Sequence, residues 1–377
     1  MNRISLLSVV HGMLLCAAPL LPGVSSAQVQ DGMDRDIAAL TRIGREGEGN
    51  EFASESAARL SKANTETLTA ILHATGKGNA VADNWLRVVA NTIVERALTS
   101  KAPLPMDSLR MFLLDTTHGE AARILAFDLL SQADAAAARK IEDELLHDPV
   151  QALRRGGVAR KIAAAGTAEP SKAKSLWMET LSAVRDEDQT QTVVNALKKL
   201  GVEVDVARHF GFLTSWHVIG PFENAERKGF DTPFAPESEI DLKKSYDGKG
   251  KTVVWQPVES KDDYGKMDLN KPLTALKEAT AYAFTSLNAD QERDVELRLG
   301  CKNAWKIWIN GTLLFSRDEY HRGQKMDQYK LKCRLKKGPN DLLVKCCQNE
   351  QTESWTVEWE FQLRVCDGAG TGIQLNK

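Results

Sequence analysis

The segment 316–324 carries the densest group of side chains that could recognise a ligand, with Tyr320, His321 and Arg322 in succession. Planar rings can cover the C–H faces of a sugar, and charged groups can bond its hydroxyls. These residue types therefore indicate carbohydrate binding, although composition alone favours an ordinary solvated loop. Asp318 near His321 would suit acid–base chemistry, but no nucleophile or second ligand accompanies them, so we expect no catalytic residue here.

Tryptophans could extend such a site, and six of the eight lie after residue 210. Trp216 and Trp305 fall on the expected core face of their strands. Trp308 and one of Trp355 and Trp359 are better candidates for exposure. Trp355 and Trp359 are four residues apart and would share a face on one strand, so packing in the core is the favoured role for both. Trp308 and Trp355 nevertheless join the candidate ligand-binding residues.

Other chemistry has little support in the sequence. The nucleophile-elbow, zinc-protease and phosphate-loop motifs are absent. Gly368, Gly370 and Gly372 follow the last expected strand with no helix after them, so we expect a flexible tail and no dinucleotide site. An acidic segment could ligate calcium, but its spacing matches no calcium loop and favours a solvated loop; its residues are Asp262, Asp263, Asp268 and Asn270. We expect neither metal nor cofactor.

Residues 1–27 have the pattern of a secretory signal peptide. Arg3 precedes an apolar stretch from Ile4 to Leu21, and Ser25-Ser26-Ala27 offers small residues for cleavage before Gln28. An uncleaved membrane anchor is the alternative. No other segment approaches the length of a membrane span. We therefore expect export to the periplasm or the exterior.

Cleavage would leave five cysteines, all in the last quarter of the chain: Cys301, Cys333, Cys346, Cys347 and Cys366. Export permits disulfides, but an odd number leaves at least one thiol unpaired. Burial as small apolar residues is at least as well supported as cross-linking. The pairing stays open.

Charge and composition exclude other classes. The 377 residues carry a formal net charge of −2, which argues against a nucleic-acid partner. Residues 28–210 hold 31 Ala and two Trp, whereas residues 211–377 hold 9 Ala and six Trp. This break predicts a domain boundary near residue 210.

Apolar spacing makes the first half helical. Leu86, Val89, Ala90, Ile93 and Ala97 lie on one face of a helix. Further helices are expected near 107–116, 119–131, 135–147, 149–165, 171–184 and 189–200. A helix pair recurring every 35–40 residues, roughly, is typical of HEAT-like solenoids, with an irregular helical bundle as the alternative.

Alternating polarity makes the second half an antiparallel β-sandwich. Apolar residues alternate with polar ones in the segments 295–301, 305–309, 342–346 and 361–365. One apolar and one polar face is typical of antiparallel sheets that cover a core. Asn310-Gly311 predicts a tight hairpin, and the segment 337–340 predicts a second turn.

The second half resembles a known kind of module. Its motifs are W-H-V-I-G-P-F-E-N at 216–224, K-I-W-I-N-G at 306–311 and N-D-L-L-V-K at 340–345. In this order they resemble the galactose-binding-like jelly roll of secreted bacterial proteins of planctomycete type, which often carry HEAT-like repeats or hydrolase domains. The resemblance covers roughly 212–366. Cys301 and Cys346 depart from the usual pattern, and the family offers no agreed catalytic residues.

We therefore expect a signal peptide (1–27), a HEAT-like helical domain (28–210), a β-sandwich domain (211–367) and a tail (368–377). The expected function is non-catalytic binding: the β-sandwich would engage a glycan or glycoconjugate through Trp308, Tyr320, His321, Arg322 and Trp355. The helical half would bind protein. An envelope assembly protein is the first alternative, and a hydrolase or its accessory subunit with a non-standard site is the second.

Overall fold

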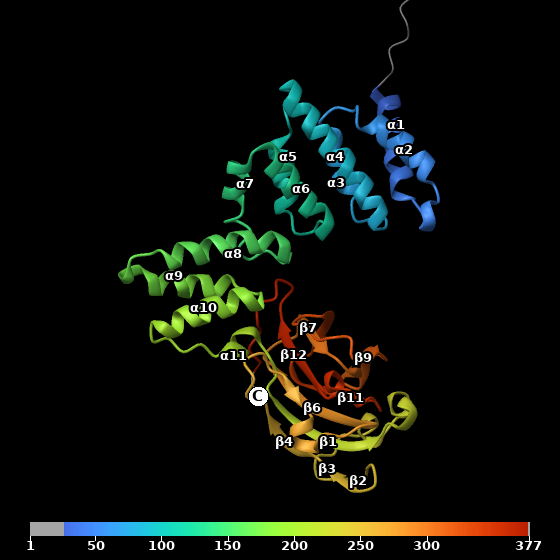
Figure 1. The fold of residues 1–377 in the computed structure, drawn as a ribbon, viewed down its shortest axis with the longest axis vertical. Coiled ribbons are helices and arrows are strands. Elements are labelled where there is room, and N and C mark those ends of the chain that lie inside the picture. The colour runs from blue at the N-terminus through green and yellow to red at the C-terminus, as the bar shows by residue number, and fades with distance from the viewer. Residues whose placement is uncertain (1–25, 376–377) are drawn as a thin grey trace, which may run out of the picture. The chain divides into compact units, whose positions relative to one another are not determined.

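The computed structural model describes residues 26–375, so the expected signal peptide lies outside them except for its last two residues (Figure 1). The chain forms two compact units, one up to Ala135 and one from Ala136. The helices precede the strands in the chain, as the composition predicts. Within the described residues, no helix is long and apolar enough to cross a membrane.

The first unit consists of helices. Their bounds are α1 (Ser26–Thr41), α2 (Asn50–Leu60), α3 (Thr67–Ala74), α4 (Ala80–Ser100), α5 (Met106–Leu114) and α6 (Glu120–Ala133). Helix α4 begins where the Asn79 side chain accepts hydrogen bonds from two backbone amides. The predicted apolar face of α4 is buried, from Leu86 to Ala97. The periodicity of the sequence is therefore confirmed in this helix.

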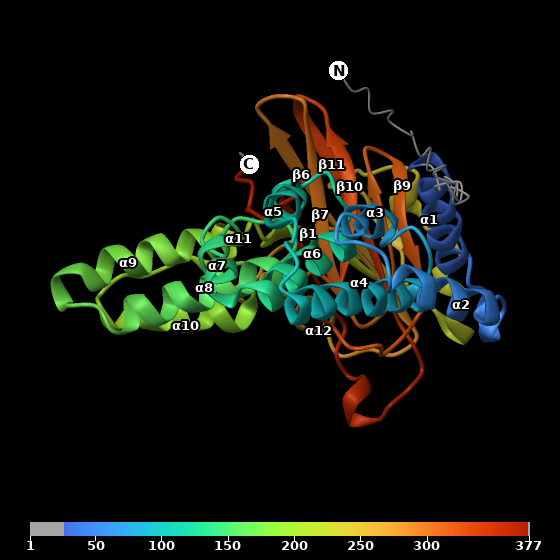
Figure 2. The same cartoon turned by 90° about the horizontal axis from the view of Figure 1, so that it is seen from above.

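The second unit begins with further helices, α7 (Ala135–Ile141), α8 (Gln151–Gly166), α9 (Pro170–Ala183), α10 (Glu187–Lys199) and α11 (Val206–Phe210). Helices α8, α9 and α10 lie side by side in both ribbon views (Figures 1 and 2). Val158, Trp177, Leu181 and Val193 form their shared core. Gly201 has a φ of 72°, so the left-handed residue expected after α10 is present.

Two antiparallel sheets follow. One has the order β4-β1-β6-β11-β8-β9 and the other β10-β7-β12-β5. Bounds in the first are β1 (Ser215–Glu223), β4 (Gln256–Glu259), β6 (Ala279–Ala289), β8 (Ala304–Ile309), β9 (Thr312–Arg317) and β11 (Gly338–Gln348). In the second they are β5 (Met267–Asp268), β7 (Arg293–Cys301), β10 (Tyr329–Leu335) and β12 (Glu360–Cys366).

The two sheets share one core. Trp216 and Trp305 contribute to it from the first sheet, as predicted, and Leu297 and Leu363 contribute from the second. The hairpin expected at Asn310-Gly311 joins β8 to β9. The strands that alternation predicts are therefore present, and they are antiparallel.

The outer face of the first sheet is covered by a long connection that contains a small sheet and short helices. Its elements are η2 (Ala225–Phe230), η3 (Ala235–Glu237), β2 (Ser245–Asp247) and β3 (Thr252–Val254). Phe222, Trp255 and Tyr282 form a second apolar cluster there. Two short helices lie elsewhere, α12 (Asn270–Leu273) and η4 (Ser354–Thr356).

The polar face of the second sheet is not exposed to solvent. Arg298 of β7 and Arg364 of β12 alternate with core residues, yet their exposed fractions are 5% and 0%. Helix α11 packs on β12, and the segment after β12 returns over it through a bridge between Cys366 and Gly372. The polar face is thus enclosed within the second unit.

Candidate functional site

The predicted ligand-binding residues fall in three places. Tyr320, His321 and Arg322 follow β9 in a loop, Trp355 lies in η4, and Trp308 lies in β8. Tyr320 and His321 are half-buried, while Arg322 is exposed. Trp355 is 58% exposed, so the core role favoured for it is wrong, whereas Trp359 is fully buried as expected. Trp355 and Trp359 are not on one strand, because Trp355 occupies a 3-10 turn before β12.

His321 and Trp355 are in direct contact. Their rings meet edge to face at a centroid distance of 5.4 Å and an interplanar angle of 88°. The His321 Nε2 atom lies 2.9 Å from Oδ1 of Asn349, and its backbone amide donates to the carbonyl of Lys302 at 2.5 Å. His321 has a φ of 58°, which is uncommon for a residue with a side chain. These contacts hold the imidazole against the exposed indole.

Asn224 and Arg227 hold the Tyr320 side chain in place. Its hydroxyl accepts a hydrogen bond from Asn224 at 3.3 Å, and the guanidinium of Arg227 lies 5.3 Å from its ring centroid. Burial raises the pKa of Tyr320 above its ordinary value, so the phenol keeps its proton at neutral pH. The hydroxyl therefore remains a hydrogen-bond donor.

Arg227 also pairs with Glu350. Its Nε lies 3.1 Å and its Nη2 lies 2.5 Å from the two carboxylate oxygens. This bidentate contact lowers the pKa of Glu350 to about 2, so the carboxylate stays ionised above mildly acidic pH. The pair supplies both a donor and an acceptor beside the aromatic rings.

We call this group of side chains the aromatic platform. Its members are Tyr320, His321, Trp355, Asn224, Arg227, Asn349 and Glu350. Sequence reasoning named the three rings but missed the other four residues. Asn224 stands in the W-H-V-I-G-P-F-E-N motif, and Asn349 and Glu350 directly follow β11, but no local pattern links them to the loop after β9.

Two predicted residues stay outside the platform. Trp308 packs on the apolar cluster under the long connection, with Trp255 and Phe284. Arg322 forms an ion pair with Glu319 at 3.1 Å. The structure thus unites three of the five predicted side chains.

In the acidic segment considered for calcium, the carboxylates accept hydrogen bonds from nearby backbone amides. Asp262 Oδ1 accepts from the amides of Tyr264 and Lys266 at 2.9 and 3.2 Å, and Asp268 Oδ1 accepts from the amide of Asn270 at 3.0 Å. Over residues 26–375, no three His, Cys, Asp or Glu side chains converge as a metal site. These carboxylates stabilise turns.

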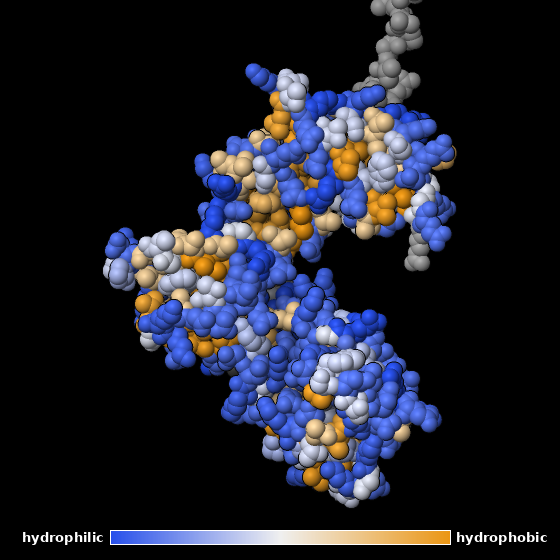
Figure 3. Space-filling model, viewed as in Figure 1, coloured by the Kyte–Doolittle hydropathy of each residue, from blue (hydrophilic) through white to orange (hydrophobic). Residues whose placement is uncertain are grey.

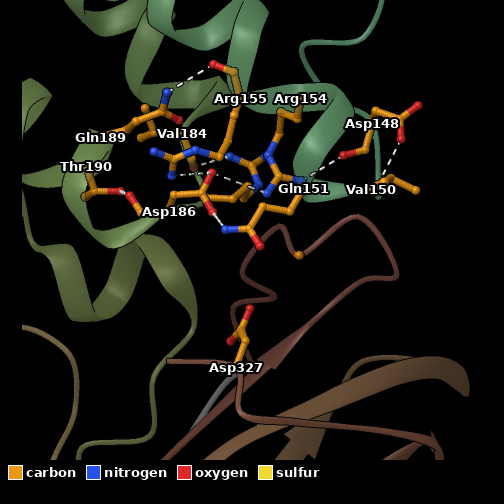
Figure 4. Close-up of polar contacts among 12 residues, drawn as sticks. Asp148, Val150, Gln151, Arg154, Arg155, Val184, Asp186, Gln189, Thr190 and Asp327 are labelled. Atoms are coloured by element: carbon orange, nitrogen blue, oxygen red, sulfur yellow. Dashed lines mark hydrogen bonds and ion pairs between the residues drawn. The ribbon is translucent and has the colours of Figure 1, made fainter. Parts of the chain in front are cut away.

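A second polar cluster lies on the helices of the same unit (Figure 4). Arg154 is 4% exposed; its Nη1 donates to the carbonyl of Asp148 at 2.8 Å, and its Nη2 lies 3.8 Å from Asp186. Arg155 forms a bidentate pair with Asp188 at 2.9 and 2.7 Å. Because Arg155 binds it so closely, the pKa of Asp188 falls to about 2.

Four arginines with little solvent exposure belong to this region. We call Arg154, Arg185, Arg298 and Arg364 the arginine group. Asp327 accepts from Arg364 at 2.6 Å through both carboxylate oxygens, and from Arg298 at 2.8 Å. No sequence pattern indicates the group, because alternation of polar and apolar residues does not show that a polar face is covered.

No protein-family model matches this chain, and no curated protein sequence is significantly similar to it. Among solved structures, an α-xylosidase of family GH31 from Xanthomonas citri has 10% identity and a TM-score of 0.21; the match covers 41% of this chain and 16% of that one. A β-glucosidase from Kluyveromyces marxianus has 11% identity and a TM-score of 0.27, with 73% and 35% covered.

The alkylpurine DNA glycosylase AlkC from Pseudomonas fluorescens matches over 92% of this chain and 95% of its own length, at 11% identity and a TM-score of 0.18. The chain spans well under two thirds of the xylosidase and the glucosidase. Similarities this low assign neither a fold family nor an activity.

Proposed function

We propose that this protein binds a glycan or glycoconjugate, without catalysis, through the aromatic platform. Trp355 carries the proposal, because a large indole is left 58% exposed while its edge-to-face partner His321 is held in place by Asn349. An exposed, fixed ring suits the apolar face of a sugar. The Arg227–Glu350 pair beside it offers charge-assisted hydrogen bonds to hydroxyl groups.

The proposal includes the organisation of the chain. The signal peptide (1–27) would direct export to the periplasm or exterior, and residues 28–210 would form a HEAT-like domain. Residues 211–367 would form a galactose-binding-like jelly roll, with a tail at 368–377. The two facing antiparallel sheets support this assignment.

A glycan array probed with the whole protein, followed by titration of the best ligand, tests the proposal. Trp355→Ala should weaken binding at least tenfold, because it removes the stacking surface, worth about 1.4 kcal/mol or more. Leu313→Ala is the matched control, since Leu313 is a 49% exposed apolar residue on β9. Absence of any bound glycan, or equal affinity of the Trp355 variant, would count against the platform.

Exposed apolar residues on the first unit favour a protein partner as a second function. Phe52 is 71% exposed, Met111 65% and Val88 57%. Orange areas on the helical surface in Figure 3 show that apolar residues reach the solvent there. Charged replacements, Phe52→Asp with Met111→Asp, should abolish co-purification of a partner with this unit while leaving glycan binding intact.

A further inference from the structure

A cavity of about 460 Å³ lies beside the arginine group, where the end of α9, helix α11 and the segment after β12 meet. Its lining includes Arg185, Arg208, His209, Thr371, Gly372 and Asp205. Two of these are arginines, and one is a histidine. The cavity lies wholly within the second unit and shares no residue with the aromatic platform.

Arg185 is the central residue of this cavity. It is 7% exposed, and its hydrogen bonds go to neutral oxygens: the carbonyls of Ser182 and Val184 at 2.7 and 2.6 Å, and the hydroxyl of Thr371 at 3.0 Å. Within residues 26–375, Arg185 forms no ion pair, and its Nε has no hydrogen-bond partner. A guanidinium has five N–H groups, so one Nη2 hydrogen beside Thr371 also remains available.

The surroundings of Arg185 are mainly positive, although the nearby carboxylate of Asp367 acts to raise its pKa. Burial, followed by the nearby charge of Arg154, lowers the pKa of Arg185 to about 10. Burial and Arg185 likewise lower the pKa of His209. The carbonyls of Ser182 and Val184, at the C-terminal end of α9, accept hydrogen bonds from Arg185 and offset part of its charge, but they supply no full negative charge. A buried cation without a counter-ion is costly, so an anion at this wall would be stabilising.

The backbone after β12 approaches the cavity wall at Arg185 closely. A Cβ atom on Gly372 would meet the carbonyl oxygen of His209 at 2.5 Å, so only glycine fits there. Gly370 has a φ of 82°, which favours glycine as well. The glycines after β12 thus bring Thr371 to Arg185. Asp205, at the mouth, is held as the cap of α11 through the amide of Arg208 at 2.8 Å.

We propose that this cavity binds a tetrahedral oxyanion, phosphate or sulfate, between Arg185 at its wall and Arg208 at its mouth. Thr371 orients the Arg185 guanidinium. The site would hold either a free ion or the charged ester group of a larger molecule. It is independent of glycan binding at Trp355.

The experiment is calorimetric titration and thermal unfolding of the whole protein at constant ionic strength. The ligands are inorganic phosphate, inorganic sulfate and glucose 6-phosphate, each compared with chloride. At least one oxyanion should bind and raise the unfolding temperature beyond the effect of chloride. Tight binding of glucose 6-phosphate would identify an ester group as the ligand, whereas binding of the inorganic ions alone would identify a free ion.

Variants locate the binding. Arg208→Gln should weaken it about tenfold, and Arg185→Gln should remove it, since each loses a charged hydrogen bond to the anion. Arg334→Gln is the control, because Arg334 is an exposed arginine on β10 whose partners are Glu292 and Asp294. Thr371→Val, which keeps the arginine, should also weaken binding if Arg185→Gln does not fold. Equal effects of phosphate, sulfate and chloride on the unaltered protein, or unchanged affinity in the Arg208 and Thr371 variants, would overturn the proposal.

Two buried cysteines are in contact in the core between the sheets. The sulfur atoms of Cys301 in β7 and Cys346 in β11 lie 3.8 Å apart, with exposed fractions of 3% and 1%. They come from opposite sheets and face each other in the shared core. Among the cysteines after residue 25, no other two sulfur atoms are in contact. Cys347, next in the chain, points to the other face of β11, where its sulfur lies 3.5 Å from the Thr280 hydroxyl.

We infer that Cys301 and Cys346 form a disulfide between the two sheets when the chain folds under oxidising conditions. Two thiols release two protons and two electrons, and a small-molecule disulfide such as oxidised glutathione takes them up to become two thiols. Burial raises the pKa of Cys346, so the reactive thiolate is disfavoured once the sheets have packed. The bond therefore forms while the core is closing.

Refolding of the reduced protein with reduced and oxidised glutathione tests this inference. Remaining thiols are alkylated, and peptides are mapped without reduction. The protein and its Cys347→Ser variant should both contain the Cys301–Cys346 pair, and Cys346→Ser should contain no pair with Cys301. Alkylation of both thiols after refolding, or a pair between Cys301 and Cys347, would contradict it.

Discussion

The ammonium group of Lys345 is fully buried under the long connection that covers the first sheet. It donates to the carbonyls of Phe230 and Thr232 at 3.0 and 2.8 Å, and to Glu237 at 2.8 Å. These three bonds use all three of its N–H groups. The hydroxyl of Tyr282 donates to the same carboxylate. This cluster ties the connection to the centre of the sheet.

Replacement of Lys345 by methionine should therefore be strongly destabilising. It would leave the Glu237 carboxylate with little solvent and no cation, which costs about 3–5 kcal/mol of unfolding free energy. Urea unfolding measures this, with Lys330→Met on the exposed side of β10 as a control that should change by about 0.5 kcal/mol or less. Adding Glu237→Gln should recover part of the loss. A Lys345 variant within about 1 kcal/mol of the unaltered protein would rule out this role.

Because of Asp327, we expect the free energy of unfolding to fall at acidic pH. Burial raises its pKa, but the hydrogen bonds and charges of Arg364 and Arg298 lower it more, so its pKa lies below the ordinary value of 3.8. A carboxyl group whose pKa is lower in the folded state contributes its full stabilisation when the pH is above its ordinary pKa. That contribution is lost as pH falls below about 4, through the folded pKa.

Asp327→Asn should accordingly lower stability at pH 7, by about 3–5 kcal/mol, because two buried arginines lose their counter-ion. The variant should also show a shallower loss of unfolding free energy between pH 4 and the acid limit. Denaturant unfolding at a series of pH values measures both effects. A variant with an unchanged slope below pH 4 would show that other carboxylates control acid unfolding.

Among the elements, the β8–β9 hairpin depends on two residues with positive φ. Asn310 has a φ of 50° and Gly311 a φ of 78°. No heavy atom lies within 4 Å of a Cβ placed on Gly311, so only its backbone conformation resists substitution. We expect Gly311→Ala to cost about 1–2 kcal/mol in chemical denaturation. Gly311→Asn should cost less, since asparagine tolerates this conformation, and equal costs would contradict the turn geometry.

Helices and strands defined by local spacing could be predicted from the sequence. The distant segments that pack over them could not. The helix expected at 189–200 is α10 (Glu187–Lys199), because its apolar face needs only nearby residues. The burial of Arg298 and Arg364 could not be predicted, because alternation cannot show that α11 and the segment after β12 cover them. Trp355 was expected in the core because spacing alone could not reveal the 3-10 turn before β12.

The aromatic platform was likewise predictable only in part. Residue types identified Tyr320, His321 and Trp355, but their polar partners come from distant parts of the chain. Asn224 and Tyr320 are 96 residues apart, and Arg227 and Glu350 are 123 apart. Such pairs depend on the order of strands in the first sheet, which one sequence does not specify.

At the scale of the whole molecule, the second unit should fold alone, and its helices should stabilise its sheets. Arg364 donates to the carbonyl of Phe210 at 3.2 Å, and α11 packs on β12. We expect fragment 136–377 to unfold cooperatively in thermal circular dichroism. Fragment 212–377, which lacks that cover over Arg298 and Arg364, should unfold several degrees lower. Equal unfolding temperatures would show that the helices contribute nothing to the sheets.

The position of β12 also sets the order in which the chain can fold during its synthesis. This last strand lies between β7 and β5 in the second sheet. Strand β12 is therefore synthesised after every other strand of its sheet. The helices up to Ala135 can form while translation continues, but the second sheet cannot be completed until residue 366 has emerged. Until then, Leu297 and Leu299 of β7 lack one of the two strands that pair with them.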